Sequence, residues 1–145
     1  MLDKLENRLS QARALFNVAH VNKTDCDKLI ELTLNSNHPL TNAYYAAGIM
    51  VSSKYTINPF KIMKIFNAGK EILEDLISEN YDNVEMRYLR YSIQLNTPKF
   101  AGYYKNIEHD REILVSYIKQ HSKSELTKHM MIFINNTNDI ILKNI

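Results

Sequence analysis

The feature that constrains this chain most is how rarely its backbone is interrupted. Glycine and proline occur only three times each in 145 residues. Turn-rich β-sandwiches and barrels need these residues at many tight turns, whereas the interior of a long helix excludes them. Apolar residues also recur at three- and four-residue spacing, which is the period of an amphipathic helix. The sequence therefore predicts an all-α protein of about seven helices.

Apolar stripes and capping residues give the expected helix boundaries. An N-cap side chain accepts a hydrogen bond from one of the first backbone N–H groups of the helix, which lack partners within the helix. We expect N-caps at Thr24, Asn58, Asp82, Asn106 and Ser122. The expected helices are about 2–19, 24–34, 40–54, 58–78, 82–95, 106–119 and 122–135, followed by an asparagine-rich stop over 135–138 and a short apolar tail.

Charge and composition exclude several classes of function. The net charge is +2, from 18 basic and 16 acidic residues, which lacks the basic excess of a nucleic-acid binder. The single cysteine, Cys26, excludes an internal disulfide and a multi-cysteine metal site. Charges from Asp3 onward leave no signal peptide, and no run approaches the ~18 apolar residues of a membrane span. We expect a cytoplasmic protein that binds neither nucleic acid nor membrane.

The chain contains an internal repeat. Lys70-Glu71-Ile72-Leu73 matches Arg111-Glu112-Ile113-Leu114 at an offset of 41 residues. Residues 40–79 and 83–120 therefore form two copies of one unit, a helix, a connection with a proline and a second helix. Residues 2–36 supply a more divergent pair and 122–135 a terminal helix, so we expect a single domain over 1–145 built from antiparallel hairpins.

The second of these pairs, residues 43–81, resembles a degenerate tetratricopeptide (TPR) repeat. In its first helix, Tyr44, Gly48 and Val51 follow the large, small, bulky order of that motif. In its second helix, Gly69, Leu73 and Leu76 fit the expected positions.

Three features depart from the TPR motif. Tyr81 replaces the terminal proline, the connection over 53–59 is long, and the period of 41 exceeds the usual length of the repeat. The resemblance implies a TPR-like right-handed superhelix and, by analogy, a protein- or peptide-binding role.

A second resemblance covers residues 83–110. The runs Arg87-Tyr88-Leu89-Arg90 and Tyr103-Tyr104-Lys105-Asn106 are similar to a family of small bacterial proteins from Bacteroidetes whose function is uncharacterised. This resemblance implies the same TPR-like fold and carries no activity with it.

The main candidate site is a polar stripe on the helix expected over 82–95. Arg87, Arg90, Tyr91 and Gln94 recur at i, i+3, i+4 and i+7, so they share one helix face. Guanidinium groups can bind a carboxylate or phosphate bidentately, and a tyrosine ring offers a stacking surface. We expect these side chains to lie exposed in a groove of helices 40–54 and 82–95. The alternative is that the arginines pair with Glu85 and other carboxylates as structural ties.

The second candidate is the irregular stretch over 97–106. It carries two lysines and three aromatic residues, and loops that hold such residues are often functional. They are Lys99, Phe100, Tyr103, Tyr104 and Lys105. Tyr104 and Lys105 extend the candidate binding surface for a peptide or anionic group. The favoured alternative is that Phe100 and Tyr104 pin a long connection against the core.

Two further patterns have simpler explanations. The helix over 58–78 carries lysines in its first half and acids in its second, which opposes the helix dipole, and a screened solvent face explains this arrangement. The spacing of His121, Glu125 and His129 aligns three possible metal ligands. However, a cap at Ser122 places His121 outside the helix, so we expect no metal.

Signatures of catalysis are absent from the sequence. There is no nucleophile elbow, no glycine-rich phosphate loop and no zinc-protease motif. His109 and Asp110 are adjacent, so on a helix their side chains point about 100° apart and form no dyad. We therefore expect a non-enzymatic module without a cofactor that binds a protein or peptide, with homodimerisation possible. The alternative is a small-molecule binder or enzyme with a pocket between the fifth and sixth helices, lined by Tyr104 and His109.

Overall fold

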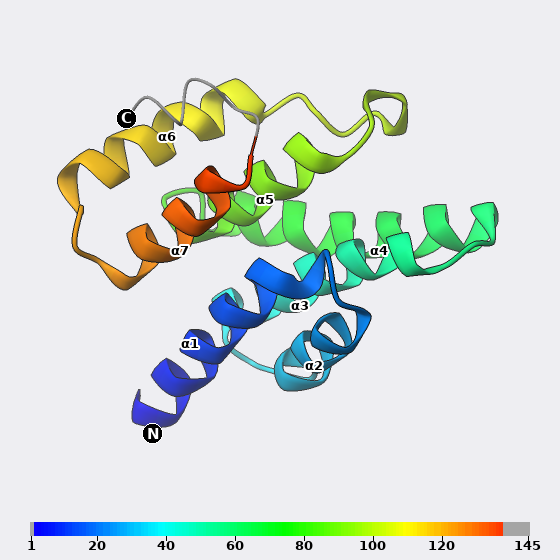
Figure 1. Cartoon of the computed structure of the whole chain (residues 1–145), viewed down its shortest axis with the longest axis horizontal. Coiled ribbons are helices and arrows are strands. Elements are labelled where there is room, and N and C mark those ends of the chain that lie inside the picture. The colour runs from blue at the N-terminus through cyan, green and yellow to red at the C-terminus, as the bar shows by residue number, and fades with distance from the viewer. Residues whose placement is uncertain (1, 138–145) are drawn as a thin grey trace. The chain divides into compact units, whose positions relative to one another are not determined.

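The computed structural model describes residues 2–137, which form seven α-helices and two short 3₁₀ turns with no strand (Figure 1). This confirms the predicted all-α class. The elements are α1 (Leu2–Ala19), α2 (Lys23–Thr33), α3 (Pro39–Ser52), η1 (Ser53–Tyr55), α4 (Pro59–Glu79), α5 (Val84–Asn96), η2 (Lys99–Ala101), α6 (Ile107–Gln120) and α7 (Glu125–Asn135).

The chain divides into two compact units, unit 1 up to Tyr81 and unit 2 from Asp82 onward. Packed helix pairs lie where the two copies of the repeat are predicted, α3 with α4 in unit 1 and α5 with α6 in unit 2. The single domain and the right-handed superhelix stay predictions. The predicted stop at Asn138 and the apolar tail lie outside the described residues.

Three of the expected N-caps are wrong by one or two residues. The Asn22 side chain, and not Thr24, accepts from the backbone N–H of Asp25. Asn83 replaces Asp82, and Ser124 replaces Ser122. In each case the side chain that caps belongs to the extended residue directly before the first helical turn, which is the geometry a cap requires.

The remaining two caps differ from each other. Asn58 caps α4 as predicted, and Pro59 occupies its first position. Asn106 stands at the cap position of α6, but its side chain makes no capping bond. It bonds to α5 instead.

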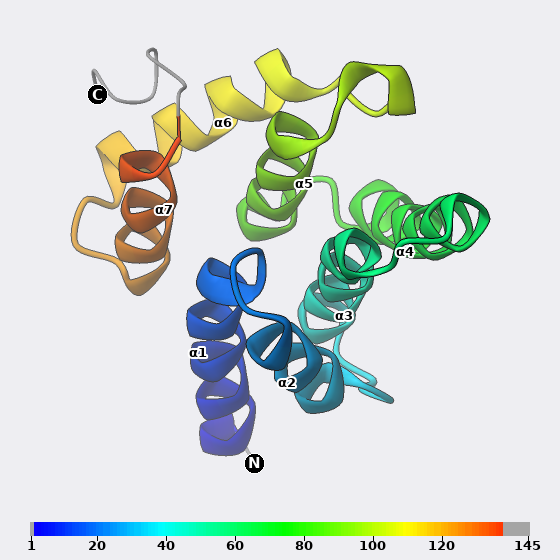
Figure 2. The ribbon, with the colours of Figure 1, turned by 45° about the vertical axis from the view of Figure 1, so that its right-hand side comes forward.

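Unit 1 is a row of four helices in which each packs against the next (Figure 2). The close approach of α3 and α4 depends on a glycine. A Cβ at Gly69 would lie 2.7 Å from the backbone oxygen of Ala46 and 2.8 Å from Cγ of Met50. No real side chain tolerates such distances, so the backbones meet here because one residue has no side chain.

The core of unit 1 also holds Cys26, whose side chain is fully buried. Its thiol donates to the backbone oxygen of Gly48 at 3.5 Å. Burial raises the pKa of the Cys26 thiol to about 11, because the thiolate loses its hydration. Phe16 of α1 meets Tyr44 of α3 edge to face, with the ring centroids 6.1 Å apart.

The carboxyl end of α1 is capped by a distant segment. The last carbonyls of a helix have no partner within it, and α1 has no basic residue in its last turn. The η1 turn supplies the donors. The Lys54 ammonium donates to the backbone oxygen of His20, and the Tyr55 hydroxyl donates to that of Ala19. The turn that follows α3 thus fixes the end of α1.

Unit 2 is organised around α5, which packs against both α6 and α7. All residues from Glu85 to Gln94 are buried, so α5 has no solvent-exposed face along this stretch. Phe133 of α7 meets the rings of Tyr88 and Tyr91 edge to face, each at 6.0 Å between centroids. None of the described helices is both long and apolar enough to cross a membrane.

Candidate functional site

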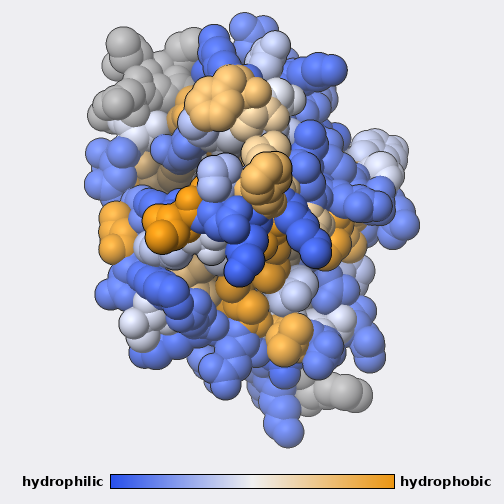
Figure 3. Space-filling model, turned by 90° about the vertical axis from the view of Figure 1, so that its right-hand side faces the viewer, coloured by the Kyte–Doolittle hydropathy of each residue, from blue (hydrophilic) through white to orange (hydrophobic). Residues whose placement is uncertain are grey.

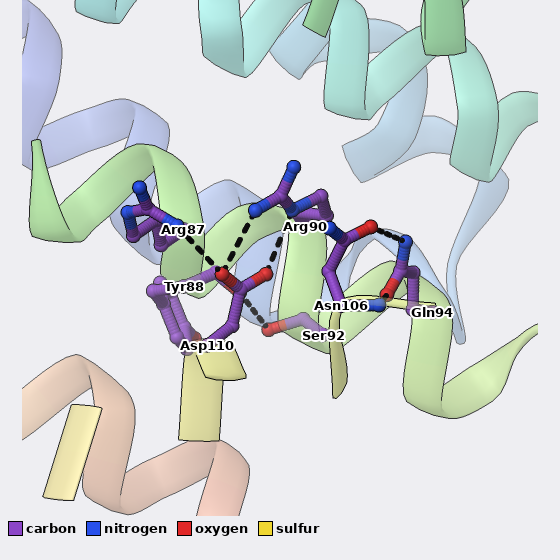
Figure 4. A network of polar contacts seen from close by, with 7 residues as sticks. All are labelled: Arg87, Tyr88, Arg90, Ser92, Gln94, Asn106 and Asp110. Carbon is purple, nitrogen blue, oxygen red and sulfur yellow. Dashed lines mark hydrogen bonds and ion pairs between the residues drawn. The ribbon is translucent and has the colours of Figure 1, made fainter. Parts of the chain in front are cut away.

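The predicted polar stripe on α5 meets a carboxylate of α6. Figure 4 shows Arg87 and Arg90 reaching Asp110 in the first turns of α6. Arg90 bonds bidentately, with Nε 2.7 Å from Oδ2 and Nη2 2.9 Å from Oδ1. Arg87 adds a third bond, Nη1 to Oδ1 at 3.1 Å. The carboxylate also lies near the amino end of α6, where the helix dipole favours a negative charge.

The expectation that Arg87 and Arg90 lie exposed in a groove is wrong. Arg87 is 9% exposed and Arg90 is 5% exposed, while Asp110 is fully buried. The alternative of a structural ion-pair network describes them, with Asp110 as a partner that the sequence had not suggested. A buried charge needs a partner and hydrogen bonds to offset its lost hydration, and these three residues supply both. The arginines therefore tie α5 to α6.

A second polar tie lies one turn further along α5. The Gln94 amide donates to Oδ1 of Asn106 at 3.0 Å, and its oxygen accepts from the backbone N–H of Asn106 at 3.2 Å (Figure 4). Gln94 is almost completely buried. Asn106 does not cap α6, because its backbone is not in the extended conformation of a cap residue.

Tyr91, the fourth residue of the stripe, is buried as well. Its ring packs on Phe133 on one side, and the guanidinium of Arg111 lies 6.0 Å from its centroid. The neighbouring Tyr88 is completely enclosed, and this burial raises the pKa of its hydroxyl well above the usual range. The whole stripe thus belongs to the interior, and a binding surface has to be sought elsewhere.

The loop over residues 97–106, which we call the Phe100 loop, carries exposed aromatic and basic side chains. The favoured interpretation, that Phe100 and Tyr104 pin this connection, is wrong. Phe100 is 92% exposed and Tyr104 is 45% exposed, whereas Tyr103 is buried and anchors the loop. Gly102 adopts a left-handed conformation with φ of 75°, which suits a residue without a side chain. Lys99 and Lys105 are also exposed.

Unit 1 carries another group of exposed apolar side chains, which the sequence did not lead us to expect. The segment over residues 57–64, which we call the Phe60 turn, spans the end of the connection from η1 and the first turns of α4. Ile57 is 98% exposed and Phe60 is 88% exposed, with Met63 partly exposed beside them. On the face shown in Figure 3, apolar side chains in orange stand among hydrophilic ones in blue. In the sequence, the run Asn58-Pro59-Phe60-Lys61 could have indicated these residues, because it places an aromatic residue and a lysine at the start of a helix.

The remaining candidates bring no reactive cluster together. His109 is exposed and the adjacent Asp110 is buried, so the two point apart as expected. No group of side chains in residues 2–137 has the make-up of a metal site. His121 ends α6 and stacks on Tyr117 with a centroid distance of 4.3 Å. Tyr104 and His109 face solvent rather than an enclosed pocket.

Comparison with known proteins adds no further constraint. No protein-family model, curated protein or solved structure matches the chain.

Proposed function

We propose that this chain is a TPR-like helical-repeat protein that binds a protein or peptide segment through the Phe100 loop. The observation that carries the proposal is the exposure of Phe100 on a loop whose two ends are held. Exposed apolar patches mark interaction sites, and aromatic anchors dominate the energetics of protein interfaces.

The construction of the loop supports this role. Tyr103 is buried beside the exposed Tyr104, and the Gln94–Asn106 pair fixes the point where the loop enters α6. An anchor that is already ordered loses little conformational freedom on binding, so more of its contact energy appears as affinity. Tyr104 and Lys105, two residues of the predicted binding surface, keep this place in the proposal.

The helix contacts support the repeat part of the proposal. The first helix of the first pair, α1, packs on α2 and on α3, and α5 packs on α6 and on α7. Stacked repeats make contacts of this kind between neighbours. A crystal structure of the chain would decide whether the hairpins continue as one right-handed superhelix.

The experiment is selection of a random-peptide phage library on the folded chain. We expect enriched peptides that bind the wild type and lose about tenfold or more in affinity with Phe100→Ser, as for an interface hot spot. The matched control is Val21→Ser, which removes another exposed apolar side chain. Equal losses with both variants, or no enriched peptide, would contradict the proposal.

Sedimentation analysis over a range of concentrations covers the remaining possibility of a homodimer. A dimer that dissociates with Phe100→Ser would make a second copy of the chain the partner of this loop. An unchanged monomer leaves the peptide as the partner.

A further inference from the structure

The Phe60 turn and the Phe100 loop both lie at the junction between the first and second helices of their pairs. The Phe60 turn includes the first turns of α4, whereas the Phe100 loop contains η2 and precedes α6, and each segment has its proline there. Pro59 is followed by Phe60 and Lys61, and Pro98 is followed by Lys99 and Phe100. Both phenylalanines are almost fully exposed. Both helix pairs thus carry exposed aromatic and basic residues at this junction.

The charge around both segments has one sign. Between Glu31 and Glu71 the chain has no aspartate or glutamate, and between Glu85 and Glu108 it again has none. The Phe60 turn carries Lys61 and Lys64, and the Phe100 loop carries Lys99 and Lys105. All four lysines are exposed, and they form no ion pair within residues 2–137. A ligand for either segment therefore meets an apolar anchor flanked by positive charge.

We propose that the Phe60 turn is a second copy of the same binding element, and that both segments take acidic peptide segments carrying an apolar residue. The inference rests on the proposed function and extends it to a second site and to the chemistry of the partner. An apolar pocket on the partner takes the phenylalanine, and carboxylates beside it complement the lysines.

The neighbours of Phe60 favour a peptide over a nucleic acid. Ile57 and Met63, the exposed apolar residues near Phe60 in the sequence, have aliphatic side chains that fit an apolar pocket but offer no plane on which a base can stack. Further along α4, Glu71 and Asp75 are exposed and would repel a long polyanion. A short acidic segment contacts the turn without reaching them.

The number of lysines favours a peptide over a membrane. Recognition of anionic lipid surfaces uses clusters of about four to eight basic residues. Each of the two segments has only two. Two charges suffice to orient a carboxylate-bearing peptide at the edge of an interface, where complementarity sets specificity and association rate.

The test uses the peptides selected on the folded chain and measures their affinities by fluorescence anisotropy. We expect the enriched sequences to be acidic and to contain an apolar residue, and their binding to weaken as salt screens the lysines. Phe60→Ser should weaken one group of peptides by about tenfold, and Phe100→Ser should do the same at the other site. The charge reversals Lys61→Glu and Lys99→Glu should weaken binding further, whereas Lys128→Glu, on the exposed side of α7, should not.

Several outcomes would overturn the inference. Enriched peptides that are neutral or basic, or that are insensitive to Phe60→Ser while still requiring Phe100, would refute it and leave the proposed function intact. If neither Phe60→Ser nor Phe100→Ser weakens binding, both this inference and the proposed function are refuted. Phe60-dependent binding to phosphatidylserine vesicles or to oligothymidylate, or Phe60-dependent self-association, would assign the turn to a membrane, a nucleic acid or a second copy instead. All these variants change exposed residues, so unchanged thermal unfolding verifies that each one is folded.

Discussion

The α3–α4 pair and the α5–α6 pair lie at corresponding positions of the predicted repeat. Close packing holds the first pair together, and a buried ion pair joins the helices of the second. At the offset of 41 residues, Gly69 corresponds to Asp110 and Ala46 corresponds to Arg87. In unit 1 these positions bring two backbones into contact without side chains between them. In unit 2 they hold a buried ion pair.

The comparison teaches that one helix-pair geometry accepts two kinds of interface. Close apolar packing gains from burial and dispersion and needs no hydrogen bonds from side chains. A buried ionic tie gains little net stability because desolvation offsets the attraction, but it is costly to break on one side only. We therefore expect the ionic pair to be more sensitive to single substitutions than the apolar one.

The largest effect is expected for Asp110→Ala. It removes the carboxylate that accepts three hydrogen bonds from Arg87 and Arg90, and loss of one partner of a buried pair costs about 3–5 kcal/mol. Urea unfolding followed by circular dichroism measures the change. Glu112→Ala, an exposed acid on the same helix, serves as the control. A loss below about 1 kcal/mol, the range of a surface pair, would show that the tie is not needed.

Gly69→Leu tests the corresponding position of unit 1. The new side chain would clash with the backbone oxygen of Ala46, so α3 and α4 must move apart, and overpacking of this kind costs about 1–3 kcal/mol. The control is Ala68→Leu, at the exposed neighbouring position, which should change the free energy of unfolding very little. If both variants unfold at the same urea concentration, the close approach does not limit stability.

Gln94→Ala is expected to have an effect of similar size to Gly69→Leu. It removes both hydrogen bonds to Asn106, so the part-buried backbone N–H and side-chain oxygen of Asn106 lose these partners, at a cost of about 1–3 kcal/mol. It should also loosen the entry of the Phe100 loop into α6. Amide hydrogen exchange of residues 103–107 should rise, and unchanged protection there would argue against this anchor.

Tyr55→Phe tests the capping of α1 by η1. Only the hydroxyl that donates to Ala19 is lost, so we expect a decrease of about 0.5–1.5 kcal/mol in the free energy of unfolding. Tyr45→Phe, in the half-buried part of α3, controls for removal of a tyrosine hydroxyl. Equal effects from the two substitutions would remove the special role of the η1 contact.

The titrations of Cys26 and Tyr88 should leave the free energy of unfolding unchanged near neutral pH and lower it increasingly at alkaline pH. Burial raises the pKa of Cys26 from 9.0 to about 11. The folded state therefore holds a proton that the unfolded state releases, and stability falls as pH rises from about 9 through 11. The pKa of Tyr88 in unit 2 is also raised, from 10.0, so its contribution to stability is lost at higher pH than that of Cys26. Unfolding of Cys26→Ala between pH 8 and 10 should depend less on pH than that of the wild type, and identical profiles would contradict this.

Local sequence information determined much of the fold. Sparse glycine and proline, regular apolar spacing and the Asn58-Pro59 start are properties of neighbouring residues, so they gave the helices and several of their ends. The cap errors at Thr24, Asp82 and Ser122 arose because several adjacent residues can cap, and the choice depends on where the backbone leaves the extended conformation.

Only the tertiary structure decided the role of the arginines and of the exposed phenylalanines. The spacing of Arg87 and Arg90 placed them on one face of α5, but whether that face meets water or Asp110 depends on how α6 packs, more than a dozen residues further along the chain. Phe100 and Tyr103 are both aromatic residues of one loop, and only the path of the loop buries Tyr103 and exposes Phe100. The sequence by itself determined the seven helices, because helix periodicity is local. Burial and charge pairing depend on contacts between segments that are distant in the sequence, so only the tertiary arrangement of the helices determines them.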